Sequence, residues 1–416
     1  MTFQAIGVRP RTAGSLLRNS ISEPNAVQRA AIPVLLARGD CVIEAPTGSG
    51  KTLAFVVPLV ERLRGHAACG ARALIVTPTR ELAAQVAVAV RAVDPSLRTV
   101  LCVGGVGYGA QTGGLRNAPD VIVGCPGRLL DLVGIGAARL ARIEYLVLDE
   151  GDEMLDQGFA RDVERIIELC RTGDHAAPQT VLASATMPEW VQRMIARHLQ
   201  SPARIHIASE QVPDLEHGVL RVERSRKIDA LSTLLRQQRR HGLSQTIVFH
   251  RTKHGTKKLA RALAALDHQA GELQGNLSQN ARDQALSAFR NRRTNVLVAT
   301  NVAARGIDVV SVGLVINYEL PESPQWLTHR VGRTARNGSP GRAITFLTPE
   351  DGAQWTKLRR LGAPALPELD AEQLLRTGEW LHTPPLRTAG MRAEPPARNR
   401  GGLSRRRRSG LKTSRR

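Results

Sequence analysis

The chain of 416 residues has few cysteines and no long apolar run. Its five cysteines are odd in number and widely spaced, which argues against a disulfide framework and against a zinc site. No apolar stretch approaches the roughly 18 residues that a membrane-spanning helix needs. The first residues also lack the charged and then apolar layout of a signal peptide. We therefore expect a protein without a membrane segment, located in the cytoplasm.

Acidic residues are scarce relative to basic ones. The sequence has 37 Asp and Glu against 58 Lys and Arg, for a formal net charge of +21, and this excess predicts a polyanionic partner. Residues 387–416 hold ten Arg and one Lys against a single acid, so they carry +10 of the total. A block of like charge with few apolar residues cannot bury enough surface to fold, so we expect a disordered Arg-rich tail. This tail could hold a polyanion near the protein, or it could serve only to keep the protein in solution.

The most informative motif reads Ala45-Pro46-Thr47-Gly48-Ser49-Gly50-Lys51-Thr52. It lies between an apolar run at 41–43 and an apolar-periodic run at 53–63, a context that predicts a strand, a phosphate-binding loop and a helix. The glycines let backbone N–H groups point at phosphates, Lys51 supplies a positive charge, and the Thr52 hydroxyl is a ligand for Mg²⁺. An ordinary Gly-rich turn is the alternative. An acidic motif downstream argues against it.

That acidic motif is the pair Asp149 and Glu150, which follows an apolar run at 145–148. A carboxylate at the end of a buried strand can hold Mg²⁺ through water, and its neighbour can accept a proton from water that attacks a γ-phosphate. A helix N-cap is the other common use of Asp at such a position. Capping alone does not explain two carboxylates after a strand in a sheet that also carries a phosphate-binding loop.

Upstream of the loop, Pro24 ends one helical stretch and starts another, which places Gln28 in the first turn of the second helix. A primary amide there can both donate to and accept from the edge of a purine. Taken alone, the same pattern also describes a surface helix residue.

Apolar runs alternate with helical patterns along most of the chain, which predicts α/β domains with parallel sheets covered on both faces. The expected strands are 41–43, 73–76, 99–103, 121–123, 145–148 and 180–183, then 246–249, 295–298, 314–316 and 343–346. Because polar motifs follow the strand ends, we expect them to converge on one crevice. We place a nucleotide-binding domain at 1–206, a linker at 207–216, a second domain at 217–350 and a short extension at 351–386.

The second domain has no phosphate-binding loop of its own, because the turn after its first expected strand reads His-Arg-Thr-Lys-His-Gly-Thr at 250–256. It contributes arginines instead. Arg330, Arg333 and Arg336 are spaced three apart, so on a helix they would line one face. They could form a solvated basic face, or they could be arginine fingers that reach the γ-phosphate when the two domains close.

As a set, these motifs resemble the DEAD-box family of ATP-dependent RNA helicases, in the family's order, from about residue 3 to about residue 348. The resemblance implies two RecA-like domains in tandem, ATP and Mg²⁺ as cofactors, and RNA as partner. It implies that Gln28 and Phe3 recognise adenine, that Asp308 touches the ribose, and that the catalytic residues are Lys51, Asp149, Glu150, Arg333 and Arg336. The implied RNA contacts are Pro78, Thr79, Arg80, Gly105, Arg128, Arg251 and Thr300. The implied interdomain coupling residues are Asp152, Ser184, Thr186, His329 and Arg330.

Several positions depart from the family's pattern. Gly151 stands where the family's naming tetrapeptide has Ala, and the other departures are Asn25, Cys125, Gln274, Asn276, Asn301 and Ala335. The charge-bearing groups Lys51, Asp149 and Glu150 are intact, so we expect the departures to affect rate and coupling rather than the class of reaction.

The implied activity is ATP-driven separation of short RNA duplexes or remodelling of RNA–protein complexes, with ribosome-assembly or RNA-decay proteins as candidate partners. One alternative is a DNA helicase, because a fold does not determine its substrate. The other is an RNA-clamping protein whose hydrolysis is weak.

Overall fold

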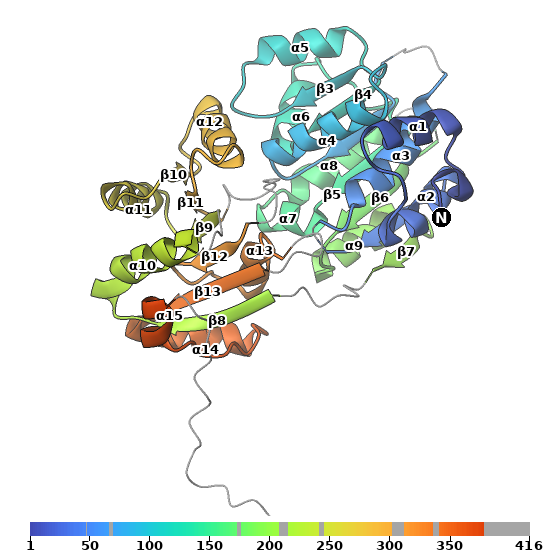
Figure 1. Cartoon of the computed structure of the whole chain (residues 1–416). Coiled ribbons are helices and arrows are strands. Elements are labelled where there is room, and N and C mark those ends of the chain that lie inside the picture. Colours follow the sequence, from blue (N-terminus) through green and yellow to red (C-terminus); the bar gives the residue numbers. More distant parts are fainter. Residues whose placement is uncertain are drawn as a thin grey trace, which may run out of the picture.

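Short apolar runs form the strands of two parallel sheets in the computed structural model, which describes residues 1–46, 48–65, 70–172, 176–207, 215–240, 245–301, 312–335 and 341–377 (Figure 1). The strands of the first sheet are β1 (Cys41–Glu44), β2 (Ala73–Val76), β3 (Thr99–Cys102), β4 (Val121–Gly124), β5 (Tyr145–Asp149), β6 (Gln179–Ser184) and β7 (Ala203–His206). Those of the second are β8 (Leu215–Arg221), β9 (Thr246–Phe249), β10 (Ala270–Leu273), β11 (Val296–Ala299), β12 (Leu314–Asn317) and β13 (Gly341–Leu347).

The first sheet has the order β3-β4-β2-β5-β6-β1-β7, and every pair in it is parallel. Its central strands are buried along their whole length, which is why they read as continuous apolar runs. The helices of this domain are α1 (Pro10–Arg18), α2 (Ala26–Leu36), α3 (Lys51–Leu63), α4 (Arg80–Val93), α5 (Tyr108–Arg116), α6 (Pro126–Gly134), α7 (Gly151–Asp156), α8 (Ala160–Cys170) and α9 (Glu189–His198). One core cluster packs α2, α3 and α4 on one face of the sheet, and another packs α6, α8 and α9 on the opposite face.

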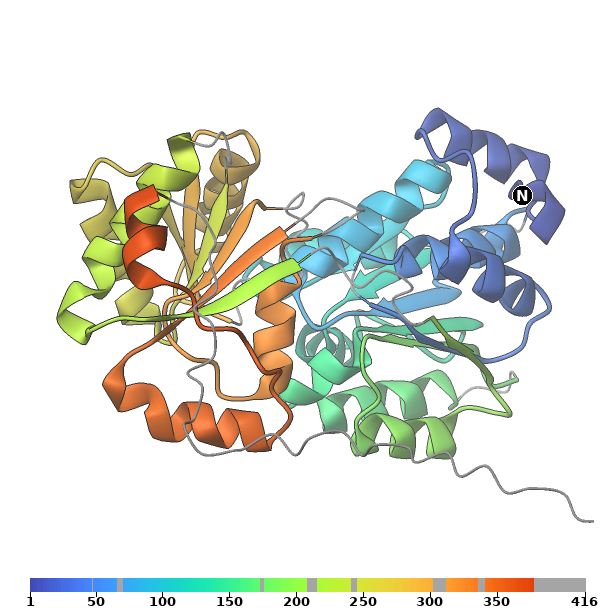
Figure 2. The ribbon, with the colours of Figure 1, turned by 60° about the horizontal axis from the view of Figure 1, so that its bottom comes forward.

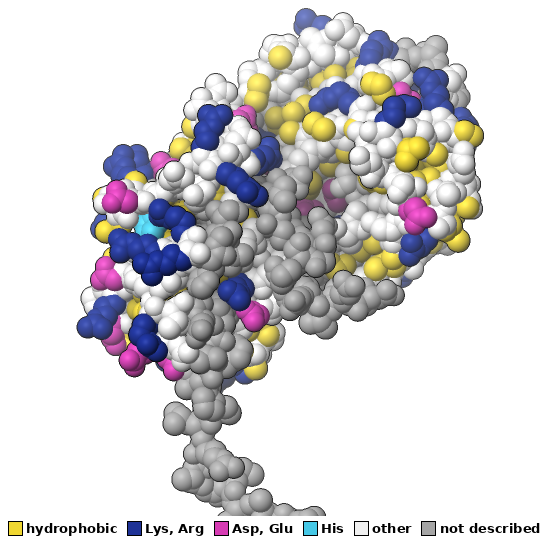
Figure 3. All heavy atoms as spheres, in the orientation of Figure 1, with side chains coloured by type: hydrophobic (Ala, Val, Ile, Leu, Met, Phe, Trp, Pro, Cys, Tyr) yellow, Lys and Arg dark blue, Asp and Glu magenta, His cyan; other side chains and the backbone are white. Residues whose placement is uncertain are grey.

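The second sheet has the order β10-β11-β9-β12-β13-β8, also parallel throughout. Its helices are α10 (Lys227–Arg240), α11 (Lys253–Ala265), α12 (Gln279–Arg290), α13 (Pro324–Val331), α14 (Gly352–Arg360) and α15 (Ala371–Thr377). Helices α10, α11 and α15 cover one face, while α12 and α13 cover the other. Helix α13 lies where the two domains meet (Figure 2). Lys and Arg side chains are numerous on the surface of the second domain, as Figure 3 shows.

The predicted α/β class with two tandem parallel-sheet domains is confirmed, and each predicted strand is present within a residue or two of its expected bounds. The sequence analysis missed three strands, β7, β8 and β10. All three lie at sheet edges, where one flank of the strand faces solvent or loops. These three strands are only partly buried, and they lack the continuous apolar run that identified the other strands.

The domain boundaries remain predictions, although β8 overlaps the last two residues of the proposed linker and α15 lies within the proposed extension. The tail at 387–416 lies outside the described residues. Within the described ranges, no helix combines the length and apolar character needed to cross a bilayer. Four cysteines, Cys41, Cys102, Cys125 and Cys170, are buried free thiols.

Candidate active site

The phosphate-binding loop has the left-handed turns that its glycines predict. Gly48 and Gly50 have φ values of +83° and +87°, and α3 begins directly after them at Lys51. A Cβ at residue 50 would lie 2.3 Å from Asn25 Nδ2, so only glycine fits there. Lys51 Nζ donates to the carbonyl oxygens of Ala45 (2.5 Å) and Pro46 (3.0 Å). The ammonium group therefore lies across the mouth of the loop, where phosphates would bind.

Helix α2 supports this loop from the side. Asn25 and Gln28 form a reciprocal capping box at its N-terminus. Asn25 Nδ2 donates to Ser49 O (2.8 Å) and Gln28 Nε2 donates to Gly50 O (3.2 Å). Gln28 is 4% exposed, so the interpretation as a surface helix residue is wrong. Asn25, noted above only as a departure from the family's pattern, thus contacts the phosphate-binding loop, and its N-cap location was the signal available.

The two acidic residues lie at the end of β5, two strands from the loop. Asp149 is buried and its Oδ1 accepts from the backbone N–H of Glu150 (3.0 Å). Burial, reinforced by the negative charge of Glu150, raises the pKa of Asp149 to about 7, while Lys51 acts in the opposite direction. Burial likewise lowers the pKa of Lys51, against the attraction of the carboxylates. The ammonium group of Lys51 and the carboxylates of Asp149 and Glu150 thus lie together in a poorly solvated part of the site.

The backbone at Glu150 is itself unusual. With φ +53° and ψ +57° this residue adopts the left-handed conformation, which a non-glycine residue rarely takes. Such strain persists where the surrounding structure enforces it, and it is common at functional sites. Here it turns the chain from β5 directly into α7.

Asp152, Ser184 and Thr186 form one hydrogen-bonded network. Ser184 Oγ accepts from Asp152 N (3.1 Å) and donates to Thr186 O (2.8 Å), while Asp152 Oδ2 accepts from Thr186 N (2.9 Å) and Thr186 Oγ1 (2.7 Å). The network joins the turn after β5 to the end of β6. Three of the predicted coupling residues are therefore in direct contact.

The second domain faces this site through α13 and the turn after it. His329 Nδ1 lies 3.8 Å from Glu153 Oε2 across the domain boundary. Arg333 is buried, and burial lowers its pKa against the attraction of Glu150 and Glu153. Its charge is therefore close enough to the acidic residues of the first domain to interact with them. The sequence analysis missed Glu153, although it follows Asp152 directly.

The expectation that Arg330, Arg333 and Arg336 line one face of a helix is wrong. Helix α13 ends at Val331, with Gly332 at its C-cap, so Arg333 lies in the following turn. Arg336 lies outside the described residues. The alternative interpretation, a basic face exposed to solvent, is also wrong for Arg330 and Arg333, because both side chains are buried.

Arg330 is the centre of a buried polar cluster within the second domain. Its guanidinium donates to Asn301 Oδ1 (2.6 Å), Asn317 Oδ1 (3.2 Å) and Glu319 O (2.6 Å). Burial lowers the pKa of Arg330 to about 9, and the carboxylates of Glu319 and Glu322 offset this only in part. Arg330 thus holds together the ends of β11 and β12 and the helix that carries His329.

Strand order divides the predicted motifs into two groups. The phosphate-binding loop, the acidic pair and Ser184 follow β1, β5 and β6, which are adjacent in the sheet. The motifs expected to contact RNA follow β2, β3 and β4, which are also adjacent. The expectation of one shared crevice is therefore corrected: the carboxyl edge of the first sheet has a nucleotide half and a separate half for RNA candidates.

Arg80, Gly105 and Arg128 come together in that second half. Arg80 passes against the backbone of Gly105, where a Cβ would lie 1.8 Å from Arg80 Nη1. The Arg128 guanidinium lies 4.2 Å over the ring of Tyr108 and donates to Val106 O (2.9 Å). Gly105 therefore makes room for Arg80, and Arg128 holds the neighbouring loop.

Two further contacts join the domains beside these residues. Arg282 on α12 pairs with Glu81 on α4, with Nη2 and Oε1 2.6 Å apart, and both side chains are largely buried. Arg80 Nη1 also donates to Gln279 Oε1 (3.3 Å). This half of the edge is thus continuous with the second domain.

The remaining predicted site residues occupy varied places. Phe3 is buried in the core cluster of α2 and α3, Thr79 caps α4 by accepting from Leu82 N (3.3 Å), and Thr300 is buried after β11. Arg251 is exposed, with its backbone N–H donating to Glu319 Oε2 (2.9 Å). Thr47 and Asp308 lie outside the described residues.

The fold and the site together define a two-domain ATPase with a phosphate-binding loop. The family models that match are the DEAD/DEAH box helicase over residues 25–194 and the helicase conserved C-terminal domain over 226–338. The DEAD-box ATP-dependent RNA helicase CshA of Geobacillus kaustophilus is 36% identical over 394 residues, covering 92% of this chain and 83% of that protein. CshA of Bacillus subtilis is 36% identical over 395 residues, covering 92% and 78%. The structure of S. cerevisiae Dbp5 bound to RNA and ADP BeF3 aligns with a TM-score of 0.79 and 27% identity, covering 89% of this chain and 96% of that one. The chain belongs to the DEAD-box family of ATP-dependent RNA helicases.

Proposed function

We propose that this chain hydrolyses ATP between its two domains and uses the reaction to separate short RNA duplexes or to remodel RNA–protein complexes. The observation that carries the proposal is the meeting of Lys51, Asp149 and Glu150 at one sheet edge, with Arg333 of the second domain facing them.

Each of these groups has a distinct role in the proposed reaction. Lys51 exchanges its two loop carbonyls for phosphate oxygens of ATP. Glu150 accepts a proton from the attacking water, and its strained backbone holds the carboxylate in place. Arg333, together with the predicted finger Arg336, stabilises the charge that develops on the phosphates.

The loop and the acidic pair suit Mg·ATP. The Ser49 hydroxyl is buried without a hydrogen-bond partner among the described residues, an orphaned polar group that a bound nucleotide could satisfy. Thr52 and Asp149 would hold Mg²⁺, which when bound supplies positive charge next to the phosphates. No group of three or more His, Cys, Asp or Glu in the described part of the chain could hold a metal alone, and Mg²⁺ is commonly bound by one or two side chains together with substrate phosphates.

RNA binding is proposed for the other half of the edge, continuing onto the second domain. The pairs Arg282–Glu81 and Arg80–Gln279 hold the domains closed beside it. Contacts to phosphates and 2′-hydroxyls would distinguish RNA from DNA without reading sequence. The bound strand would be bent, so that its partner strand dissociates, and hydrolysis would reopen the domains. A cytoplasmic location and assistance from ribosome-assembly or RNA-decay proteins belong to the same proposal.

Steady-state ATPase assays with matched RNA and DNA oligonucleotides test this function. We expect strong stimulation by RNA and little by DNA; equal stimulation would favour the DNA-helicase alternative. Glu150→Gln should retain ATP and RNA binding but lose turnover, whereas Glu168→Gln, on the exposed surface of α8, should match the parent. Parental turnover by Glu150→Gln would refute the catalytic assignment. A parent that binds RNA with ATP but fails in single-turnover hydrolysis would be the clamping protein instead.

A further inference from the structure

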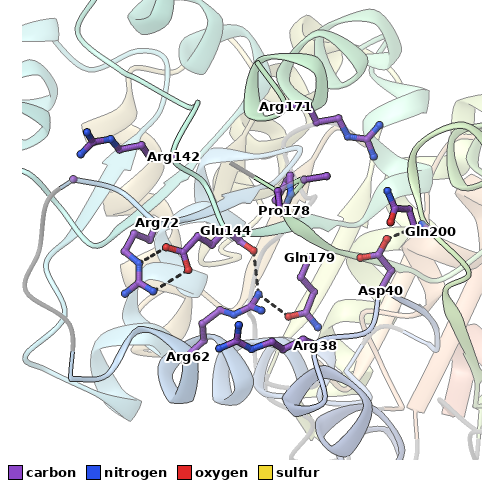
Figure 4. A pocket seen from close by; sticks show the side chains of 13 residues that line it. Arg38, Asp40, Arg62, Arg72, Arg142, Glu144, Arg171, Pro178, Gln179 and Gln200 are labelled. Atoms are coloured by element: carbon purple, nitrogen blue, oxygen red, sulfur yellow. Dashed lines mark hydrogen bonds and ion pairs between the residues drawn. The ribbon is translucent and has the colours of Figure 1, made fainter. Parts of the chain in front are cut away.

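A cavity of about 780 Å³, lined by many charged side chains, lies on the first domain, away from the nucleotide site (Figure 4). Its lining comes from segments that directly precede β1, β2, β5 and β6, so it lies at the amino ends of the parallel strands. Helix α3 begins at Lys51 in the phosphate-binding loop and contributes Arg62 to the cavity from its last turn. Thirteen helical residues span about 20 Å. The cavity is therefore a separate place, with a volume typical of small-ligand sites.

The lining is rich in arginine, and its few acids are already engaged. The charged residues are Arg38, Arg62, Arg72, Arg142, Arg171, Asp40 and Glu144. Asp40 accepts from the backbone N–H groups of Thr180 and Gln200, each at 2.7 Å. The two carboxylate oxygens of Glu144 accept from the Arg72 guanidinium at 2.6 and 2.8 Å. Arg38, Arg62 and Arg171 form no ion pair with either acid.

Arg62 and Arg171 donate only to neutral oxygens among the described residues. Arg62 Nη1 bonds to Glu144 O (3.0 Å) and to Gln179 Oε1 (2.8 Å), while Arg171 Nη2 bonds to the carbonyl of His198. These bonds orient the guanidinium groups, and neither group forms an ion pair with a described residue, although the carboxylate of Glu144 lies near enough to Arg62 to offset part of its charge.

Arg38 makes no side-chain hydrogen bond or ion pair with any described residue. Figure 4 shows its guanidinium close to that of Arg62. Burial and then the like charges of Arg38 and Arg72 lower the pKa of Arg62, and Tyr145 and Glu144 offset this only in part. Gathering cations in this way costs free energy unless an anion joins them.

We propose that this cavity binds a small ligand that carries more than one phosphate group, such as a nucleoside polyphosphate or inorganic polyphosphate. Arginine suits phosphate because its planar fork of N–H donors can bond two oxygens at once. Arg62 is pre-oriented by Gln179, and Arg38 is available to close over the anion. A continuous RNA strand fits less well, since the RNA candidates lie at the opposite edge of the sheet.

The test uses the full chain with Mg·ADP·BeF₃ and a short oligouridine in amounts stoichiometric with the protein, so that the nucleotide site and the main RNA surface are occupied and no free nucleotide competes for the cavity. Inorganic tripolyphosphate is titrated by calorimetry into the parent, Arg38→Glu and Arg161→Glu. Arg161 is an exposed residue in the first turn of α8, outside the cavity, and its reversal changes the net charge equally. We expect saturable binding by the parent, a roughly ten-fold or greater loss for Arg38→Glu, and parental affinity for Arg161→Glu.

Further titrations distinguish a nucleoside polyphosphate from inorganic polyphosphate as the ligand, and they test the competing explanations of binding. Tighter binding of GTP than of tripolyphosphate would show that a nucleoside also occupies the cavity, and equal binding would show that phosphates alone are held. Equal weakening in both charge-reversal variants would overturn the proposal, because general attraction to a basic protein would then explain the binding. So would binding of a polyglutamate peptide, lost in Arg38→Glu, without binding of tripolyphosphate. Arg38→Gln repeats the test if Arg38→Glu does not fold.

Discussion

Replacing Gly151 by Ala tests how this chain tolerates its departure from the family's tetrapeptide. Gly151 is the first residue of α7 and does not have a positive φ. A Cβ built there would lie 3.7 Å from the nearest atom of Leu182, an ordinary packing distance. Removing glycine's unfolded-state freedom contributes about 0.4–1 kcal/mol, and packing one methyl group adds a similar amount. We therefore expect the free energy of unfolding to rise by about 1 kcal/mol and Tm to rise by about 2–4 °C.

Thermal unfolding by circular dichroism and the RNA-stimulated ATPase measure the outcome. The ATPase of Gly151→Ala should stay near that of the parent, because the substitution leaves Glu150 and the Asp152 network in place. Gly158→Ala is the matched control: it has open space around its Cβ but a φ of +80°, so it should lose about 1 kcal/mol of stability. A lower Tm or a large loss of ATPase in Gly151→Ala would refute the reasoning, since it would mean that the turn after β5 requires glycine.

Three other predictions follow from the described contacts and from the charge of the chain. Gly105→Ala should displace Arg80, with which its Cβ would collide, and so weaken RNA binding about ten-fold; unchanged RNA affinity by fluorescence anisotropy would contradict this. Burial lowers the pKa of His217 to about 4, so the unfolded chain binds a proton that the folded domain excludes, and stability should fall by about 3 kcal/mol as pH drops from 7 to 4. His217→Gln should flatten this pH dependence in chemical denaturation, and an unaltered slope would show that other groups cause it. Deleting residues 387–416 should make the slope of log K for RNA against log salt shallower by roughly 3 units, if four or five of the eleven basic side chains in this tail reach phosphates. Parallel plots of equal height would mean that the tail does not touch RNA.

The local features of the nucleotide site were predictable from sequence because their causes are local. Glycines at 48 and 50 permit left-handed turns wherever they occur, and a buried parallel strand must be apolar along its length. The alternation of such strands with helices accordingly predicted both sheets, and the acidic pair was located at the end of β5. The edge strands β7, β8 and β10 were not predicted, because their partial burial goes with a weaker apolar pattern in the sequence.

Tertiary structure decided which of these motifs became neighbours. Strand order is set by crossovers between segments far apart in the chain, and the order β3-β4-β2-β5-β6-β1-β7 separates the nucleotide motifs from the RNA candidates although they alternate in sequence. Burial of Arg330 and Arg333 likewise depends on packing against asparagines and acids far from them in sequence. The arginine-lined cavity arises in the same way, because parallel strands bring their amino ends to one edge and place Arg38, Arg62 and Arg171 around a common space. Sequence thus determined the chemistry of each segment, and the non-local order of the sheet determined where that chemistry meets.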